Sequence, residues 1–232
     1  MEYLSNIQLY FSEDLNLITD ETEVHHIQKV MRHNIDDIIY VTDGKGTILK
    51  SKLTRIGKRE IIIEKIEKYQ YENVLKHISL CIPLLKNPDR FTFAIEKTIE
   101  LGFTNFIIYQ PKITTKKEFK KERIEKLGIA AMKQSLRSFL PKFEFIKELN
   151  QLDCLNINFF DQNGGENFLG ANILTGNDYT FVFGGESGFS SEEYRFLKNY
   201  KSYKLTPNRL RSETAIIAAS TLIAMNQQLI NV

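Results

Sequence analysis

The pattern of hydrophobic residues changes near residue 75, and this change most limits how the chain can fold. Between residues 38 and 66, short β-rich runs alternate with turns such as Asp43–Gly46, which predicts a small antiparallel β-barrel. After residue 75, apolar runs alternate with helical patterns, which predicts an α/β domain with a parallel sheet. We therefore predict two domains, at residues 1–72 and 73–232.

Spacing places several elements within these domains. Asp20–Glu23 precedes Val24, Ile27, Val30 and Met31, whose spacing predicts one amphipathic helix with an acidic start. In the second domain the expected strands are residues 78–82, 106–109, 155–160 and 179–183, and the expected helices are about 89–101, 117–138 and 214–225. The last helix is apolar nearly all round, so we expect it either in the core or against a second copy of the chain.

Composition excludes several classes of protein. No apolar stretch approaches the roughly 18 residues of a membrane span, and the first residues lack the pattern of a signal peptide. The 2 cysteines and 4 histidines show no spacing typical of a metal site or a disulfide framework. We therefore expect a cytoplasmic protein without a bound structural metal and without membrane association.

Basic residues gather in the second domain. Lys112–Lys147 contains 11 lysines and arginines against 4 acidic residues, and such a local field attracts a polyanion. A solvated helix face is the alternative explanation for the same charges.

The glycine-rich segment Phe183–Ser190 directly follows an apolar strand and precedes Ser190–Glu193, which is typical of a helix start. Glycines at the carboxyl end of a strand let the backbone approach a ligand closely. The segment fits neither the dinucleotide-binding motif GxGxxG nor the nucleophile motif GxSxG, and it lacks the lysine of a phosphate-binding loop. A tight connection between strand and helix remains the alternative.

A second polar segment, Leu205–Ala215, leads into the apolar last helix, with Ser212 or a neighbour as the expected N-cap. An arginine such as Arg211 is locally unfavourable at the positive end of a helix, which favours an anionic ligand or a nearby carboxylate. A surface pair between Arg211 and Glu213 explains the spacing equally well.

These two segments carry a resemblance to a known family. GGESGFS at 184–190 and LRSETA at 210–215 resemble the GPEGGFS and LRTETA motifs of the RsmE-type 16S ribosomal RNA uridine N3-methyltransferases, which belong to the SPOUT class. Further stretches resemble family motifs in the same order: His26–Arg32, Asp43–Gly46, Lys86 with Asp89–Arg90, Glu96–Gly102, and Gln134–Arg137 with Pro141. The chain departs from the motifs at Gly185, Ser187, Thr206, Asn208, Lys133 and Pro111–Thr115.

The resemblance implies an N-terminal PUA-like barrel and a C-terminal α/β domain ending in a trefoil knot. It further implies a homodimer formed through the knot region and the C-terminal helix, S-adenosylmethionine as cofactor, and the 16S rRNA of the small ribosomal subunit as partner. By motif match, the residues that would bind the cofactor are Phe183, Gly184, Gly185, Gly188, Leu205, Leu210 and Arg211.

The same resemblance implies that uridine N3 attacks the methyl group of the cofactor, so that the N3 proton must leave. Our hypothesis is that Arg211 stabilises charge on the uracil carbonyls and that Glu213 orients Arg211 or accepts the proton. The alternative is that Glu213 only caps its helix and that water takes the proton.

Contacts with RNA phosphates are expected from Arg32, His33, Lys86, Arg90, Lys97 and Arg137. For Lys97, an ion pair with Glu100 one helical turn away is the competing explanation. Two other functions stay open: a SPOUT methyltransferase with another RNA target, and a noncatalytic RNA-binding factor in ribosome assembly.

Overall fold

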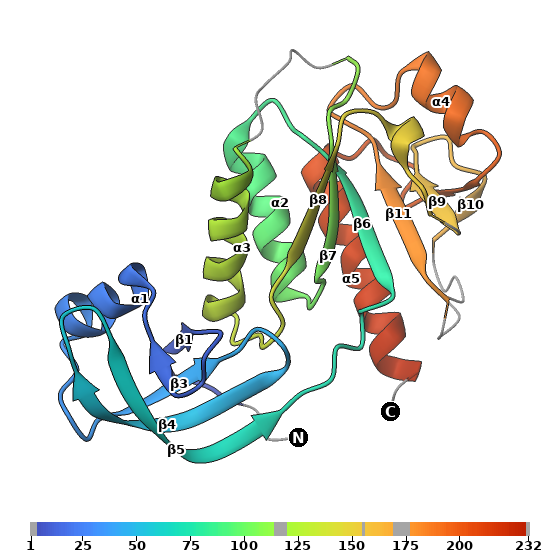
Figure 1. Ribbon diagram of the computed structural model, residues 1–232. Helices are drawn as coiled ribbons and strands as arrows, with labels where there is room; N and C mark the ends of the chain where they lie inside the picture. Colours follow the sequence, from blue (N-terminus) through green and yellow to red (C-terminus); the bar gives the residue numbers. More distant parts are fainter. Residues whose placement is uncertain (1–3, 114–119, 155, 169–176, 231–232) are drawn as a thin grey trace. The chain divides into compact units, whose positions relative to one another are not determined.

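The computed structural model describes residues 4–113, 120–154, 156–168 and 177–230. The chain forms two compact units, Met1–Asn73 with Ile129–Leu140, and Val74–Gly128 with Pro141–Val232 (Figure 1). The division into 1–72 and 73–232 did not anticipate that residues 129–140 group with the N-terminal unit. Helix α3 (Lys121–Gln134) therefore contributes residues to both units.

The first unit is built on a five-stranded sheet with the order β1-β3-β4-β5-β2. Its strands are β1 (Leu9–Phe11), β2 (Leu17–Ile18), β3 (Ile38–Thr42), β4 (Thr47–Ile56) and β5 (Ile61–Gln70). Strands β3, β4 and β5 confirm the β-rich runs predicted between residues 38 and 66. The predicted antiparallel pairing holds except at β1, which pairs with β3 in parallel. Closure into a barrel stays a prediction.

The predicted helix after Asp20 is present but changes its type along its length. The Asp20 carboxylate accepts hydrogen bonds from the backbone of Thr22 and Glu23 and starts α1 (Glu21–His25), which continues as a π-helix over His26–Val30. Val24 and Ile27 are buried, whereas Val30 is 57% exposed. Because a π-turn holds an extra residue, it rotates the following side chains off the buried face.

Residues 129–140 join the first unit through backbone and ionic contacts. Gly46 N donates to Ser138 O at 2.9 Å, and Leu140 N donates to Gly44 O at 2.8 Å. The ammonium group of Lys133 forms an ion pair with the buried carboxylate of Glu23. These partners are far apart in sequence, so the spacing of residues along the chain did not predict the contact.

The second unit contains a seven-stranded sheet with the order β10-β12-β9-β11-β6-β7-β8, in which every pair is parallel. Its strands are β6 (Ile78–Pro83), β7 (Asn105–Tyr109), β8 (Lys142–Ile146), β9 (Ile157–Phe160), β10 (Glu166–Asn167), β11 (Tyr179–Phe183) and β12 (Lys201–Lys204). The predicted α/β fold with a parallel sheet is confirmed. The carboxyl ends of all seven strands therefore lie at one edge of the sheet, where open α/β folds bind ligands.

Helices flank this sheet (Figure 1). Besides α3 they are α2 (Pro88–Glu100), the short 3-10 helix Leu149–Gln151, α4 (Ser191–Leu197) and α5 (Ser212–Ile230). The helix expected at 117–138 is shorter: it ends at Gln134 because Leu136 has a φ of 55°, and residues 117–119 lie outside the described residues.

Helix α5 runs behind β6 and β11 and packs against α2 (Figure 1). Ile216, Ala219 and Ile223 are fully buried, whereas Met225 is 56% exposed. One face of this apolar helix thus belongs to the core of the unit. The trefoil knot and the homodimer stay predictions. Among the described residues, none of the helices has both the length and the apolar character needed to cross a membrane.

Candidate functional site

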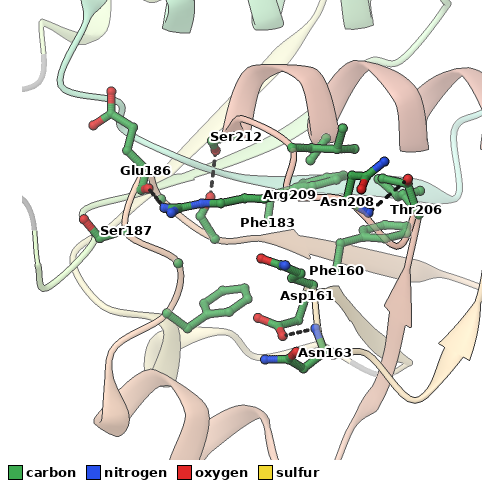
Figure 2. Close-up of a pocket in the computed structure, with 18 of the residues that line it drawn as sticks. Phe160, Asp161, Asn163, Phe183, Glu186, Ser187, Thr206, Asn208, Arg209 and Ser212 are labelled. Atoms are coloured by element: carbon green, nitrogen blue, oxygen red, sulfur yellow. Dashed lines mark hydrogen bonds between the residues drawn. The ribbon is translucent and has the colours of Figure 1, made fainter.

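A pocket of about 330 Å³ lies at the carboxyl ends of β9, β11 and β12 (Figure 2). Three connections form its walls: the loop after β9, the glycine-rich loop after β11 and the loop that joins β12 to α5. The lining residues are Phe160, Asp161, Gln162, Asn163, Phe183, Gly184, Gly185, Glu186, Ser187, Gly188, Phe189, Tyr194, Leu205, Thr206, Asn208, Arg209, Leu210, Ser212 and Ala215.

The glycine-rich loop is a tight turn held at its base. Gly188 N donates to Gly185 O at 2.9 Å, and Gly188 has a φ of 74°, a conformation that side chains rarely adopt. The Ser212 hydroxyl donates to Gly184 O at 2.7 Å, and the buried Tyr109 hydroxyl donates to Phe183 O at 2.8 Å. The loop is therefore tied both to the start of α5 and to β7.

The side chain of Arg209 reaches from the loop before α5 toward the glycine-rich loop, as Figure 2 shows. One of its terminal nitrogens lies 3.5 Å from the carbonyl oxygen of Glu186. The Glu186 carboxylate turns away from Arg209 and accepts from Lys86 N at 3.2 Å. Two loops that line the pocket thus contact each other through Arg209.

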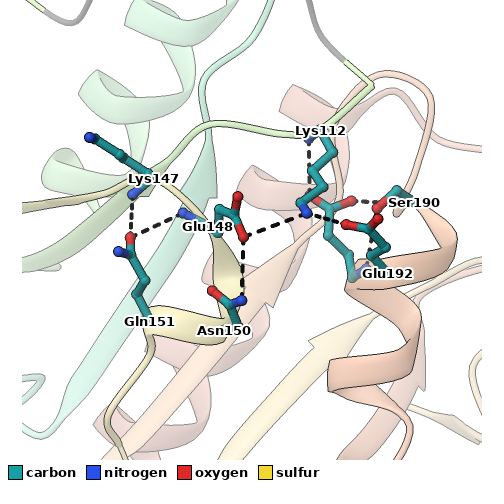
Figure 3. Close-up of polar contacts among 8 residues, drawn as sticks. Lys112, Lys147, Glu148, Asn150, Gln151, Ser190 and Glu192 are labelled. Carbon is teal, nitrogen blue, oxygen red and sulfur yellow. Dashed lines mark hydrogen bonds and ion pairs between the residues drawn. The ribbon is translucent and has the colours of Figure 1, made fainter.

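A polar cluster holds the far end of the glycine-rich loop, where α4 begins (Figure 3). The buried Glu193 carboxylate accepts from Ser190 N at 2.6 Å and from Lys112 N at 3.3 Å. The Lys112 ammonium group forms ion pairs with Glu192 and, at 3.5 Å, with Glu148. The hydrogen bond from Lys112 lowers the pKa of Glu192 below its usual value. Ser190 caps α4 as the sequence predicted.

Six of the seven residues expected at a cofactor site line this pocket together: Phe183, Gly184, Gly185, Gly188, Leu205 and Leu210. Arg211, the seventh, is exposed and does not line it. Sequence reasoning missed the contribution of Phe160–Asn163, which follows β9. The signal was present, because 155–160 was a predicted strand and its carboxyl end should lie at the ligand-binding edge.

The two residues expected to be catalytic lie side by side in sequence but differ in environment. Arg211 is exposed, whereas Glu213 is only 9% exposed in the first turn of α5. Glu213 Oε1 lies 3.5 Å from Arg90 Nε, so the ion-pair partner that the structure gives Glu213 is Arg90. Glu213 Oε2 is buried and has no hydrogen-bond partner among the residues that the structure describes.

The six candidate RNA contacts divide between the units: Arg32, His33 and Arg137 belong to the first, and Lys86, Arg90 and Lys97 to the second. Both ring nitrogens of His33 have internal partners, the Tyr10 hydroxyl at 3.0 Å and the Asp37 carboxylate at 3.2 Å. The structure also contains the ion pair of Lys97 with Glu100, at 2.7 Å.

The remaining candidates differ in exposure. Arg137 is partly buried, and burial lowers the pKa of its guanidinium. Arg32 and Lys86 are exposed, as phosphate contacts require. Within the described ranges, no group of three or more histidine, cysteine, aspartate or glutamate side chains could hold a metal ion.

Comparisons with known proteins match both units. An RNA methyltransferase domain model matches residues 72–224, and an RNA methyltransferase PUA domain model matches residues 18–66. Ribosomal RNA small subunit methyltransferase E of Bacillus subtilis is 30% identical to this chain over 92% of the chain and 91% of the relative. The protein of the same name from Rickettsia conorii is 28% identical over 92% of this chain and 91% of that relative.

A solved structure shares the fold over nearly the whole chain. The ribosomal RNA small subunit methyltransferase E of Neisseria gonorrhoeae, solved bound to S-adenosyl methionine, matches with a TM-score of 0.81 over 97% of this chain and 98% of that one, at 24% identity. The second unit has a parallel sheet with a pocket formed by loops at its carboxyl edge. Together with these matches, this defines an RNA methyltransferase domain accompanied by a PUA domain. The chain belongs to the ribosomal RNA small subunit methyltransferase E family.

Proposed function

We propose that this protein transfers a methyl group from S-adenosylmethionine to N3 of a uridine in the 16S rRNA of the small ribosomal subunit. The observation that carries the proposal is the pocket, where six residues expected from the motif match converge at the edge of the sheet. Membership of the ribosomal RNA small subunit methyltransferase E family supports the substrate class. The acceptor atom, uridine N3, rests on the motif resemblance.

The pocket fits S-adenosylmethionine in chemistry. Phe160, Phe183, Leu205 and Leu210 offer apolar surface for an adenine, and Gly184, Gly185 and Gly188 bring bare backbone to the same cavity. Asp161, from the loop after β9, also lines the pocket, and its carboxylate oxygens accept from Asn163 N and the Tyr194 hydroxyl. A positively charged cofactor is attracted by such a carboxylate. When bound, S-adenosylmethionine supplies an activated methyl group.

Residues of the chain would align the nucleophile and accept its proton. Uridine N3 carries a proton that must leave when the new N–C bond forms, and a positioned side chain that accepts it speeds such a step roughly 100- to 10,000-fold. Glu213 stands at the start of α5, directly after Ser212 of the pocket wall. The exposed Arg211 would stabilise the negative charge that develops on the uracil carbonyls.

RNA binding would use exposed cations on each unit. Arg32 on the first unit and Lys86 on the second are the exposed candidates, and phosphate contacts of this kind position the RNA without reading its sequence. His33 and Lys97 would contact RNA only if their internal contacts rearranged, and Arg137 is partly buried. The working form would be a homodimer through α5 and the knot region, in the cytoplasm where small subunits are assembled.

One assay tests the proposal. The purified protein is incubated with methyl-labelled S-adenosylmethionine and small ribosomal subunits that lack the modification, and the product is located by nucleoside analysis. We expect label on uridine N3. Label on another nucleoside would instead indicate a different RNA target. Cofactor binding without any transfer would contradict the proposed substrate, and absence of cofactor binding would indicate a noncatalytic RNA-binding factor.

A further inference from the structure

Asp161 lines the pocket at a point where two neighbouring strands end. Strands β9 and β11 pair in the sheet, and Phe160 at the end of β9 is the register partner of Phe183 at the end of β11. The residues that follow them, Asp161 and Gly184, both line the pocket. The Asp161 loop and the glycine-rich loop therefore begin from neighbouring strand ends at one edge of the sheet.

Two donors hold the Asp161 carboxylate in place. Its Oδ1 accepts from Asn163 N at 2.7 Å, and its Oδ2 accepts from the hydroxyl of Tyr194, which also lines the pocket. Burial and this hydrogen bond raise the pKa of Tyr194, so the hydroxyl keeps its proton at neutral pH and remains a donor. A carboxylate has about four acceptor positions, which leaves about two of them for a ligand.

The other acidic residue of the pocket lining, Glu186, is directed elsewhere. Its carboxylate accepts from Lys86 N at 3.2 Å, and Figure 2 shows it pointing away from Asp161. Of the two carboxylates, that of Asp161 is thus the one that other residues of the pocket lining hold in position.

The position of Asp161 fits the ribose of S-adenosylmethionine. Phe160 and Phe183, whose stacked ring centroids lie 5.1 Å apart, offer apolar surface for the adenine, and Asp161 directly follows Phe160. The ribose is bonded to the adenine, whereas the positive sulfur is bonded to C5′ on the far side of the ribose. Ribose hydroxyls supply donors for the acceptor positions that remain. In dinucleotide-binding folds, a carboxylate that accompanies the glycine-rich turn accepts from a ribose hydroxyl in this way.

We propose that Asp161 accepts hydrogen bonds from the ribose hydroxyls of S-adenosylmethionine, and that Tyr194 is a positioning residue that orients the Asp161 carboxylate. This inference rests on the proposed function. S-adenosylhomocysteine, the product that remains after methyl transfer, carries the same ribose without the positive charge on sulfur. Asp161 therefore contributes equally to the affinities for the cofactor and for this product.

The competing hypothesis is that Asp161 attracts the positive sulfur of the cofactor. The two hypotheses differ in the ligands that the carboxylate distinguishes. We would measure Kd by calorimetric titration for S-adenosylmethionine, S-adenosylhomocysteine, and the 2′-deoxy and 3′-deoxy analogues of S-adenosylhomocysteine. The proteins are wild type, Asp161→Asn and Tyr194→Phe, with Asp153→Asn and Tyr200→Phe as matched controls outside the pocket lining.

Asparagine keeps the size of aspartate but replaces one carboxylate oxygen with an amide nitrogen. We expect Asp161→Asn to raise Kd about tenfold for both S-adenosylmethionine and S-adenosylhomocysteine, the effect of losing one hydrogen bond to a charged group. For at least one deoxy analogue the same substitution should change Kd by less than about threefold, because the hydroxyl that Asp161 binds is missing. Tyr194→Phe should raise Kd about threefold, and the controls should bind as wild type.

Three results would overturn the inference. Unchanged Kd values for Asp161→Asn would remove Asp161 from the cofactor contacts. A loss confined to S-adenosylmethionine would assign the carboxylate to the positive sulfur. A wild-type protein that binds both deoxy analogues as tightly as S-adenosylhomocysteine would show that no ribose hydroxyl is held, and this result decides even if Asp161→Asn does not fold. A wild-type protein that binds neither S-adenosylmethionine nor S-adenosylhomocysteine would instead contradict the proposed function itself.

Discussion

The Ser212 hydroxyl donates a hydrogen bond of 2.7 Å to the carbonyl oxygen of Gly184, joining the first turn of α5 to the glycine-rich loop. Ser212→Ala removes this donor and leaves the carbonyl unpaired, which costs about 1 kcal/mol. We expect the Kd for S-adenosylmethionine to rise about fivefold. Calorimetric titration checks this. Thr214→Ala, which removes an exposed hydroxyl from the same turn, is the control and should leave Kd unchanged.

Gly188 isolates the effect of backbone conformation on the same loop. A Cβ at Gly188 would meet nothing within 4 Å, but its φ of 74° is strained for any side chain. Gly188→Ala should therefore weaken cofactor binding by about 1–2 kcal/mol, the usual cost of this conformation. Gly165→Ala, where a Cβ would make only ordinary contacts, is the control. Equal affinities for the two variants would contradict a role for this turn in binding.

The buried Glu193 carboxylate bridges Ser190 N and Lys112 N, so one amide group in its place can accept from only one of them. Glu193→Gln should lower the Tm and weaken cofactor binding, because the glycine-rich loop loses an anchor. Glu192→Gln removes an exposed ion pair with Lys112, and such pairs contribute little. Thermal unfolding and cofactor titration compare the variants. Similar losses for both would show that the surface ion pair matters more than the buried bridge.

Lys86 tests the RNA surface of the second unit. Its side chain is exposed, and we expect Lys86→Gln to weaken subunit binding and to reduce the slope of log affinity against log salt concentration by about 1. Binding is measured across a salt series, with the exposed Lys198→Gln on the α4 side as the control. A slope that matches wild type would remove Lys86 from the RNA contacts.

The two cysteines should differ in reactivity. Burial raises the pKa of Cys81 well above its usual value, and burial also raises the pKa of the partly exposed Cys154. A higher pKa leaves less thiolate at a given pH, and the thiolate is the nucleophile. At pH 8 we expect iodoacetamide to modify Cys154 slowly and Cys81 not at all, as followed by mass spectrometry. Urea should make both react. Modification of Cys81 at the rate of Cys154 in the folded protein would contradict its burial.

Local signals determined much of the fold. The strands at Ile78–Pro83 and Tyr179–Phe183 are short apolar runs, and the helix after Ser190 begins with a capping residue, so each was predictable from neighbouring residues. The same signals failed for Val30 and Met31, because a π-turn changes the helical spacing and sequence periodicity assumes a regular helix. Short edge strands such as Glu166–Asn167 were missed because two residues carry no periodicity.

The sequence by itself therefore determined the two kinds of architecture, the parallel sheet and the glycine-rich loop at a strand end. Only the tertiary structure decided which distant residues meet. Residues 129–140 group with the first unit, and Asp161 joins the pocket wall. Glu213 pairs with Arg90, a residue that sequence spacing did not indicate as its partner. The physical reason is that hydrophobic periodicity depends on residues within one turn or strand, whereas an ion pair between α2 and α5 depends on how the two helices pack.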